Sequence, residues 1–125
     1  MLLPSRFSRH FLLKKNNRLK TNSQFSRVYK KGRSFVSDLF VLYVYKGNSD
    51  NKIIGFSVSK KVGKACIRNK IKRRAMEVIR LHINLINKKS YLVFVARKVV
   101  SESSYKDIEK SILKLLSKAD LLEMN

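Results

Sequence analysis

Residues 60–80 read KKVGKACIRNKIKRRAMEVIR and combine an apolar helical stripe with a dense cluster of positive charge. Nine of these 21 residues are Lys or Arg, and one, Glu77, is acidic. The spacing predicts a long amphipathic helix over residues 67–86, because its apolar residues share one arc of a helical wheel. That arc comprises Ile67, Ile71, Ala75, Val78, His82, Leu85 and Ile86. The opposite arc is almost purely cationic, which favours a binding face over a solvated face of mixed charge.

Upstream of this helix, the chain predicts a short helix followed by strands. Residues 21–32 read TNSQFSRVYKKG, where Asn22 is expected to cap the helix and Gly32 to end it in the left-handed conformation. The next residues are rich in β-branched and aromatic types, which is typical of strands. The turn at 47–52 is expected to join strand 40–45 to the following strand as an antiparallel hairpin.

Downstream, residues 91–96 read YLVFVA, a continuous apolar run that predicts a central strand. A final helix is predicted over residues 104–119, with Ser104 as its N-cap. The expected element order is therefore α-β-β-β-α-β-α. This order defines an α+β fold, a two-layer α/β sandwich in which helices pack on a small sheet.

The net charge is the most unusual property of the composition. The 125 residues carry 29 Lys or Arg against eight Asp or Glu, for a formal charge of +21. Self-repulsion on this scale disfavours the compact state unless a polyanion binds, and the most common polyanion is nucleic acid. A membrane surface is the other candidate, although no 18-residue apolar run is present. The expected organisation is a basic, flexible arm over 1–16, one domain over 17–119 and a tail over 120–125.

A self-sufficient catalytic site is not indicated by the residue types. No two acidic residues are placed as a plausible metal-binding pair near the basic helix, and His10 and His82 belong to different elements. His82 is expected to be a packed border residue. Cys66 is the only cysteine, so neither a disulfide nor a cysteine zinc site is predicted. We therefore expect no catalytic residue and no metal ligand in this chain.

Two sets of residues are candidates for nucleic-acid contacts. Gly63 predicts a tight loop whose amides, with the helix N-terminus behind them, suit a phosphate. Lys64, Arg68 and Lys72 recur at i, i+4 spacing and can follow a nucleic-acid backbone, while Asn69 can donate and accept hydrogen bonds. Separately, the aromatic residues Phe25, Tyr29 and Tyr43 could stack on unpaired bases, although periodicity alone favours core packing for them.

The stretch GFSVSKKVGKACIRNKIKRRAMEVIR resembles the signature of the protein subunit of bacterial ribonuclease P. RLKTNSQFSRVYKKG and FVLY upstream, and VFVARK and SSYKDIEKSILKLL downstream, match the same family in the same order. The resemblance covers about residues 17–119. Two positions depart from the family pattern. Lys70 stands where Arg is usual, which keeps the charge but loses the bidentate hydrogen bonding of a guanidinium. Met76 stands where many members have another Arg.

The resemblance implies a non-catalytic protein cofactor of a ribozyme. In that family the catalytic RNA subunit, with Mg²⁺ bound mainly by RNA, cleaves the 5′ leader from precursor tRNA. It also implies a mixed sheet with a left-handed crossover through the long helix, against the usual right-handed rule. A cytoplasmic location, and no membrane or DNA partner, are expected.

The resemblance assigns residues to two surfaces. The residues expected to bind the catalytic RNA are Lys64, Arg68, Asn69, Lys70, Lys72 and Arg73. The residues expected to form the cleft for the leader are Phe25, Tyr29, Val41, Tyr43, Ser59, Lys60 and Lys61. The alternatives, in order, are another small basic RNA-binding protein such as a ribosomal protein, an intrinsic nuclease and a basic membrane-surface protein.

Overall fold

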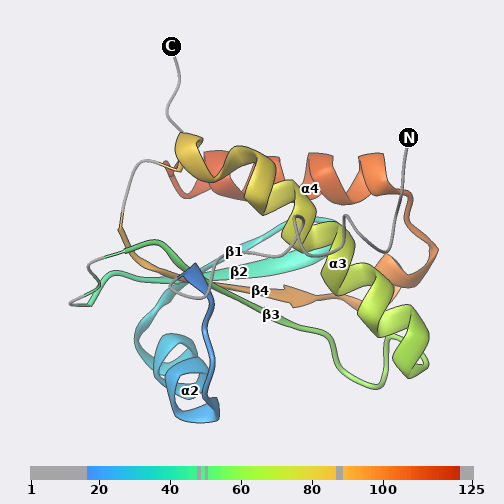
Figure 1. Ribbon diagram of the computed structural model, residues 1–125, viewed down its shortest axis with the longest axis horizontal. Helices are drawn as coiled ribbons and strands as arrows, with labels where there is room; N and C mark the ends of the chain where they lie inside the picture. Colours follow the sequence, from blue (N-terminus) through green and yellow to red (C-terminus); the bar gives the residue numbers. More distant parts are fainter. Residues whose placement is uncertain (1–16, 48, 50, 87–88, 122–125) are drawn as a thin grey trace.

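A four-stranded mixed sheet organises the chain, with strand order β1-β2-β4-β3 (Figure 1). The structure, a computed structural model, describes residues 17–47, 49, 51–86 and 89–121. The strands are β1 (Arg33–Val36), β2 (Phe40–Tyr45), β3 (Ile53–Ser57) and β4 (Tyr91–Ala96). The helices are α2 (Asn22–Lys31), α3 (Ala65–His82) and α4 (Tyr105–Lys118), with short 3-10 turns at Ile83–Leu85 and Lys98–Glu102. The predicted element order and the α+β class are confirmed.

The predicted hairpin between β2 and β3 is wrong. β4 lies between these two strands, antiparallel to β2 and parallel to β3. The physical reason lies in the strand compositions: β4 is apolar on both faces and suits a central position, whereas β3 carries Gly55 and Ser57. The parallel neighbours β3 and β4 are connected through α3, so this is the crossover whose left hand the family resemblance implies.

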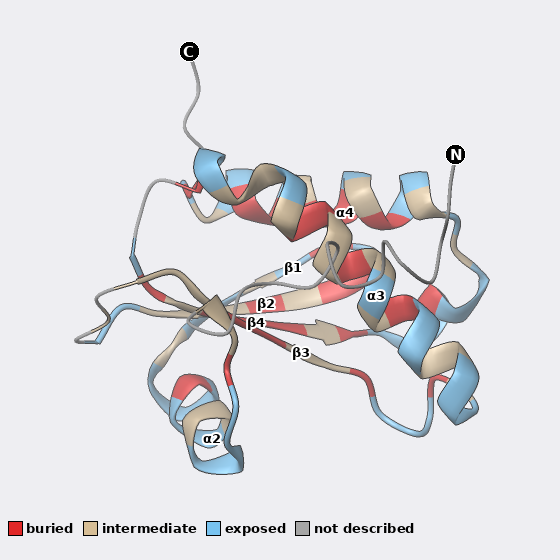
Figure 2. Ribbon diagram, in the orientation of Figure 1, coloured by how far each residue is buried: buried red, intermediate tan, exposed pale blue. Residues whose placement is uncertain are grey.

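The two faces of the sheet are covered by different helices. α3 and α4 pack together on one face, and the shorter α2 lies on the other (Figure 1). Buried residues are concentrated between the sheet and the α3/α4 layer (Figure 2). Leu42, Leu92 and Phe94 of the sheet meet Ile112 and Leu115 of α4 there, and all five side chains are fully buried. This layer supplies most of the apolar burial that stabilises the fold.

The long helix differs from its prediction at both ends. It begins at Ala65 rather than 67 and ends at His82, after which Ile83–Leu85 form a 3-10 turn. Because a 3-10 turn advances by 120° per residue instead of 100°, the apolar arc is lost there, and Leu85 is exposed. Ile79, which lies outside the predicted arc, is buried instead. His82 is half-buried and its Nδ1 donates to the Val78 carbonyl, so it is a border residue as predicted.

The short helix α2 is capped differently from the prediction. Thr21 is the N-cap, and it forms a capping box with Gln24, while Asn22 is the first helical residue. Gly32 ends the helix with a φ of −83°, not in the left-handed region. A Cβ on Gly32 would lie 2.6 Å from the Val28 carbonyl oxygen and 2.9 Å from that of Val44. Close approach of α2 to β2, rather than backbone handedness, therefore requires glycine here.

The C-terminal helix agrees with its prediction. Ser104 is the N-cap, and its hydroxyl accepts a hydrogen bond from the amide of Asp107 while the Asp107 carboxylate accepts from the Ser104 amide. The predicted arm, residues 1–16, lies outside the described residues. At the other end, Leu121 is 1% exposed and belongs to the core, two residues beyond the predicted end of the domain.

Candidate nucleic-acid interface

The loop between β3 and α3 forms a basic end of the molecule. Tight turns at Ser59–Val62 and Lys60–Gly63 are closed by backbone hydrogen bonds of 3.1 and 3.2 Å. Ser59, Lys60 and Lys61, expected in the leader cleft, are exposed on this loop and follow the cleft-lining residue Val58 without lining the cleft themselves. The N-cap of α3 is Lys64, whose side chain makes no capping hydrogen bond, and the first turn of the helix contains no acidic residue. This helix N-terminus therefore presents amides and cations together, which suits a phosphate.

Arg68 links the loop to the helix. Its Nε donates to the Gly63 carbonyl at 3.1 Å, and its side chain is half-buried. One donor of the guanidinium is therefore used to hold the loop, and the remaining N–H groups are available to a ligand. Arg68 thus combines a structural contact with its predicted RNA contact.

The rest of the predicted RNA-subunit surface lies along α3. Asn69, Lys70 and Arg73 are exposed, whereas Lys72 is half-buried. Arg74 differs from these, because its Nη1 donates to the Ser103 carbonyl at 3.3 Å. The exposed basic face is therefore narrower than the helical wheel indicates, and Lys72 points away from it into the neighbouring cleft.

A cleft of about 400 Å³ lies between α2, β3 and α3. It is lined by Asn22, Phe25, Ser26, Tyr29, Phe56, Ser57, Val58 and Lys72. Phe25 and Tyr29 thus line an open cleft, as the family resemblance implies for the leader site. Lys72, expected on the RNA-subunit surface, lines this cleft instead and places a cation beside its aromatic wall.

The aromatic wall continues from α2 onto the sheet. The ring centroids of Phe25 and Tyr29 are 6.4 Å apart, and Tyr29 meets Tyr43 edge-on at 5.1 Å. Tyr43 and Val41 are half-buried on β2 and do not line the cleft itself. The strand order explains this, because β4 separates β2 from the β3 edge where the cleft opens. Tyr43 therefore extends the cleft's aromatic surface through its contact with Tyr29, whereas Val41 does not line the cleft.

Gly55 allows α2 to lie this close to β3. A Cβ on Gly55 would come within 2.6 Å of Cζ and 2.7 Å of Cε1 of Phe25. The Phe25 ring therefore occupies the space that a side chain would need, and this contact sets the position of one cleft wall.

β3 is an edge strand, and its outer edge faces the cleft. The Leu19 amide donates to the Ile54 carbonyl at 2.9 Å on this edge. Because backbone groups alternate in direction along a strand, the N–H and C=O of Phe56 point the same way as those of Ile54. The cleft therefore offers backbone donors and acceptors next to its aromatic rings, a combination that suits unpaired bases.

The sequence reasoning missed five of the cleft residues. Asn22 and Ser26 could have been found, because with Phe25 and Tyr29 they follow the i, i+3, i+4, i+7 pattern of one helix face. Phe56, Ser57 and Val58 could not, because their position at the cleft depends on β3 being the edge strand.

Within the part of the chain that the structure describes, no three His, Cys, Asp or Glu residues are grouped as metal ligands. Among the same residues, no helix is long and apolar enough to cross a membrane. Cys66, at the start of α3, is exposed and free.

The fold and the surface define a class: a small, strongly basic α+β protein with one closed sheet face, one half-open aromatic face and a basic loop–helix end. The family model described as Ribonuclease P matches residues 13–120. The chain belongs to the ribonuclease P protein family. Proteins of this family are components of an endoribonuclease complex that processes tRNA.

Relatives and solved structures agree with this membership. The ribonuclease P protein component of Clostridium novyi is 45% identical over 111 residues, covering 87% of this chain and 98% of that protein. That of Alkaliphilus metalliredigens is 41% identical, covering 88% and 99%. The Staphylococcus aureus RNase P protein superposes with a TM-score of 0.80 at 34% identity, covering 85% and 97%. The Thermotoga maritima protein gives 0.75 at 31% identity, covering 80% and 97%.

Proposed function

We propose that this chain is the non-catalytic protein component of a ribonuclease P ribonucleoprotein, and that it contacts two RNAs through two adjoining surfaces. The N-terminal end and the exposed face of α3 bind the catalytic RNA subunit. The cleft beside α2, with the adjoining loop residues 59–61, holds the 5′ leader of precursor tRNA. The RNA subunit, with its Mg²⁺, carries out the cleavage. The particle acts in the cytoplasm.

The observation that carries this proposal is the junction of the two surfaces at Lys72. The residue belongs to the basic helix, yet it lines the cleft together with Phe25 and Tyr29. A single-stranded leader leaving the cleft would therefore run directly onto the cationic end of the molecule. Aromatic stacking beside a cationic groove is the usual arrangement for binding unpaired nucleic acid.

The protein's role in this proposal is electrostatic and positional. Catalytic RNA and precursor tRNA are both polyanions, and a chain with a formal charge of +21 lowers the repulsion between them. Lower repulsion reduces the concentration of Mg²⁺ that the complex requires. The leader contact adds affinity for precursor tRNA over mature tRNA, because mature tRNA has no leader to occupy the cleft.

Reconstitution with the catalytic RNA tests this function. The chain alone should leave precursor tRNA intact, and the chain added to catalytic RNA should increase cleavage most at low Mg²⁺. No enhancement at any Mg²⁺ concentration would contradict the proposal and favour another small RNA-binding protein. Cleavage by the chain alone, surviving ribonuclease treatment, would favour an intrinsic nuclease.

Two variants separate the surfaces. Tyr29→Ala should weaken binding of precursor tRNA to the complex by about 5- to 150-fold, the equivalent of about 1–3 kcal/mol for one lost stack. Binding of leaderless tRNA should be unchanged, and Tyr29→Phe should behave as wild type. Arg73→Ala should instead weaken association with the catalytic RNA. The slope of the logarithm of this association constant against the logarithm of salt concentration should fall by about 0.7–0.9. If both variants affect precursor and leaderless tRNA equally, the two surfaces are not distinct.

A further inference from the structure

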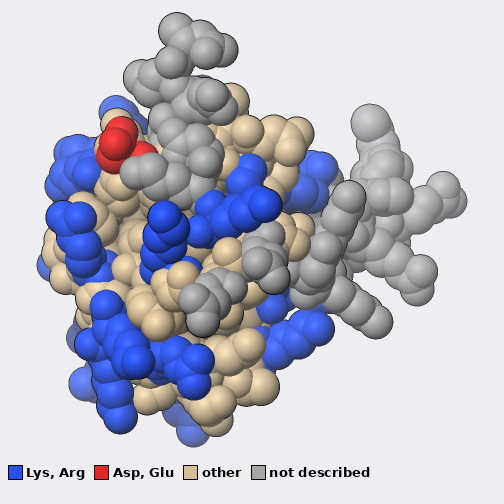
Figure 3. All heavy atoms as spheres, turned by 90° about the vertical axis from the view of Figure 1, so that its left-hand side faces the viewer, with Lys and Arg blue, Asp and Glu red and all other residues tan. Residues whose placement is uncertain are grey.

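The end of the sheet opposite the basic loop carries a second cationic surface. β1 begins, β2 ends and β4 begins at this end, because the register pairs Arg33 with Val44 and Tyr45 with Tyr91. A strand of six residues spans about 20 Å, so this end is separated from the α3 N-terminus by roughly that length. Figure 3 faces this end and shows Lys and Arg side chains gathered over it, with one small acidic group near its upper left edge.

A pocket of about 280 Å³ is set into this surface, below the C-terminal end of α4. Its cationic lining residues are Lys31, Arg33, Lys46 and Lys89, all of which are exposed. Its apolar lining residues include Phe35, Val44, Ala119 and Leu121. Among the described residues that line the pocket none is acidic, although Asp120 lies between two of them. We call this the end pocket.

The end pocket has a rim of cationic side chains and a floor of apolar ones. The Arg33 guanidinium carbon lies 5.5 Å from the centroid of the Phe35 ring, so this cation extends over an apolar surface. Leu121 is 1% exposed and closes the floor from the α4 side. A ligand seated here would meet apolar groups below and cations around it.

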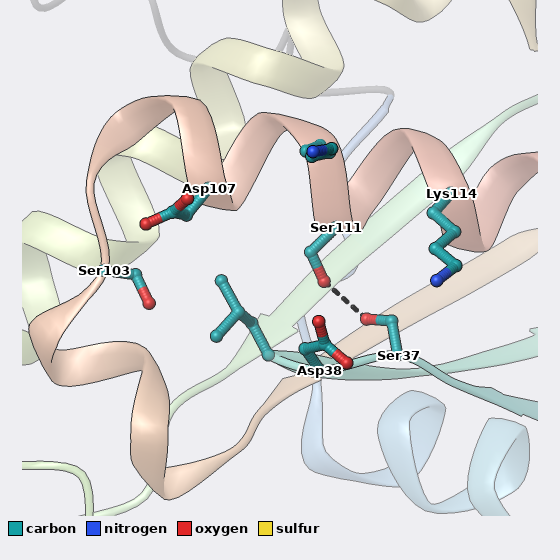
Figure 4. A pocket seen from close by; sticks show the side chains of 8 residues that line it. Ser37, Asp38, Ser103, Asp107, Ser111 and Lys114 are labelled. Carbon is teal, nitrogen blue, oxygen red and sulfur yellow. Dashed lines mark hydrogen bonds between the residues drawn. The ribbon is translucent and has the colours of Figure 1, made fainter.

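A second pocket of similar size shows that this charge pattern is not general. It lies between the turn after β1 and α4, and its volume is about 350 Å³. Asp38 and Asp107 line it together with Lys110 and Lys114, and a hydrogen bond joins Ser37 to Ser111 at its wall (Figure 4). Its lining balances both signs of charge within the protein, so it needs no external anion. Among its described lining residues, the end pocket has no such balance.

The local structure accounts for only part of the charge at the end pocket. Lys31 lies in the last turn of α2, where a cation favours the helix dipole. Arg33, Lys46 and Lys89 lie outside any helix, so this explanation does not extend to them. Placing four cations around one pocket costs repulsion that a bound polyanion would remove.

We propose that the end pocket is a further RNA contact site that takes an unpaired nucleotide, with its base on the apolar floor and its phosphates on the cationic rim. This inference rests on the proposed function, in which RNA is the polyanion bound at the other end of the sheet. A lipid surface fits less well, because the apolar floor is recessed behind the cations and a flat bilayer cannot reach it. The nucleotide comes from the catalytic RNA or from precursor tRNA.

Because the end pocket and the α3 loop lie at opposite ends of the sheet, RNA can occupy both sites at once. The chain would then be held from two sides, and its salt dependence would exceed that of the α3 surface alone.

A matched pair of double variants tests the proposal in the full chain. Lys46→Gln/Lys89→Gln removes two charges from the rim, and Lys110→Gln/Lys114→Gln removes two exposed charges from α4. The first arm measures affinity for catalytic RNA, and the second measures affinity of the assembled complex for precursor tRNA. A third arm uses vesicles of phosphatidylglycerol.

The rim variant should lose about 10- to 30-fold affinity at 0.15 M salt in one RNA arm, with a slope lower by about 1.4–1.8, as two lost phosphate contacts predict. The control variant should lose less than about threefold. The arm that shows the loss identifies the source of the nucleotide. Equal behaviour of the two variants in both RNA arms, or a selective loss on vesicles alone, would overturn the inference. In that case an intact Tyr29 and Arg73 phenotype would still support the proposed function, whereas no binding of wild-type protein to catalytic RNA would end both.

Photocrosslinking tests the base contact separately from charge. RNA carrying 4-thiouridine should crosslink to the segment 44–46, which lines the end pocket, in addition to the cleft, when it is bound to wild-type protein. The rim variant should lose the crosslinks to this segment and retain those to the cleft. Crosslinks confined to α3 and the α2–β3 cleft would overturn the floor assignment.

Discussion

The two faces of the sheet bury apolar residues to different extents. On the α3/α4 face Leu42, Leu92 and Phe94 have no exposed surface. On the α2 face Val41 and Tyr43, which alternate with Leu42 along β2, are only half-buried. The residue types on the two faces are similarly apolar, so composition does not explain the difference. The cover does: two long helices pack on one face and one helix of ten residues on the other.

This difference teaches where function can be sought in a small basic protein. A fully covered face contributes stability, and its side chains have no surface left for a partner. A partly covered face keeps aromatic surface open beside a helix that sets its width. In this chain the open face also meets the cationic end of α3, which gives it both contacts that unpaired RNA requires.

The largest effect should be on the free energy of unfolding, to which the two faces of the sheet should contribute unequally. Phe94→Ala should lower the free energy of unfolding by about 3–5 kcal/mol, because it removes a buried ring that contacts Phe40 and Phe56. Tyr43→Ala, on the other face, should cost less than half as much. Urea denaturation measures both, and equal losses would show that the two faces contribute alike.

A smaller effect should come from adding a side chain where α2 packs against β3. Gly55→Ala should lower the free energy of unfolding by about 1–3 kcal/mol, because the added methyl group meets the Phe25 ring. It should also weaken binding of precursor tRNA by displacing that wall of the cleft. In a Phe25→Leu background the penalty should shrink, as a double-mutant cycle would show. An unchanged penalty in that background would place the strain elsewhere.

Removing the N-cap hydroxyl of α2 should have a still smaller effect on the free energy of unfolding. Thr21→Ala should cost about 1 kcal/mol, because it removes the side-chain half of the capping box with Gln24. Thr21→Ser keeps the hydroxyl and should remain near wild type. Hydrogen exchange of α2 amides should rise in the alanine variant while α4 amides stay protected. Uniform loss of protection would mean that the two helices do not unfold separately.

The smallest effect concerns Tyr105 of α4 and the free energy of unfolding at high pH. Burial, with Glu77 and Glu109 nearby, raises the pKa of Tyr105 above 10.0, and Arg80 opposes this shift. The folded state therefore holds the phenol proton more tightly than the unfolded state. Stability is complete below pH 10.0 and is lost as pH rises through the folded pKa. Tyr105→Phe should remove this loss, so the stabilities of wild type and variant should run parallel below pH 10.0 and diverge as pH rises above it; parallel stabilities throughout would contradict the shift.

Much of the fold followed from local patterns. The caps and apolar stripes predicted α3 and α4 within a few residues, because helix periodicity depends on near neighbours. The central position of residues 91–96 followed from a continuous apolar run. The hairpin prediction failed because adjacency in sequence was taken for adjacency in the sheet. Pairing across the crossover depends on how α3 packs, which local residues do not encode.

The candidate site divides in the same way. Residue type offered Phe25 and Tyr29 as stacking candidates, but their spacing favoured the core, and only the family resemblance placed them in a cleft. Charge and helix spacing had already indicated part of the basic surface. Lys72 was assigned to the RNA-subunit surface and lies in the cleft lining, because a helical wheel shows direction but not what packs beside the helix. The end pocket had no signal at all, since its cations come from α2, β1 and the ends of β2 and β4.

By itself, the sequence determined the charge, the element types, the two amphipathic helices and the family to which the chain belongs. These depend on composition, short spacings and an ordered run of motifs, all of which are local. Only the tertiary structure decided that β3 is an edge strand, that one sheet face stays half-open, and that the basic helix end adjoins the cleft. The physical reason is that strand order and helix placement are set by burial summed over the whole chain, which no single segment contains.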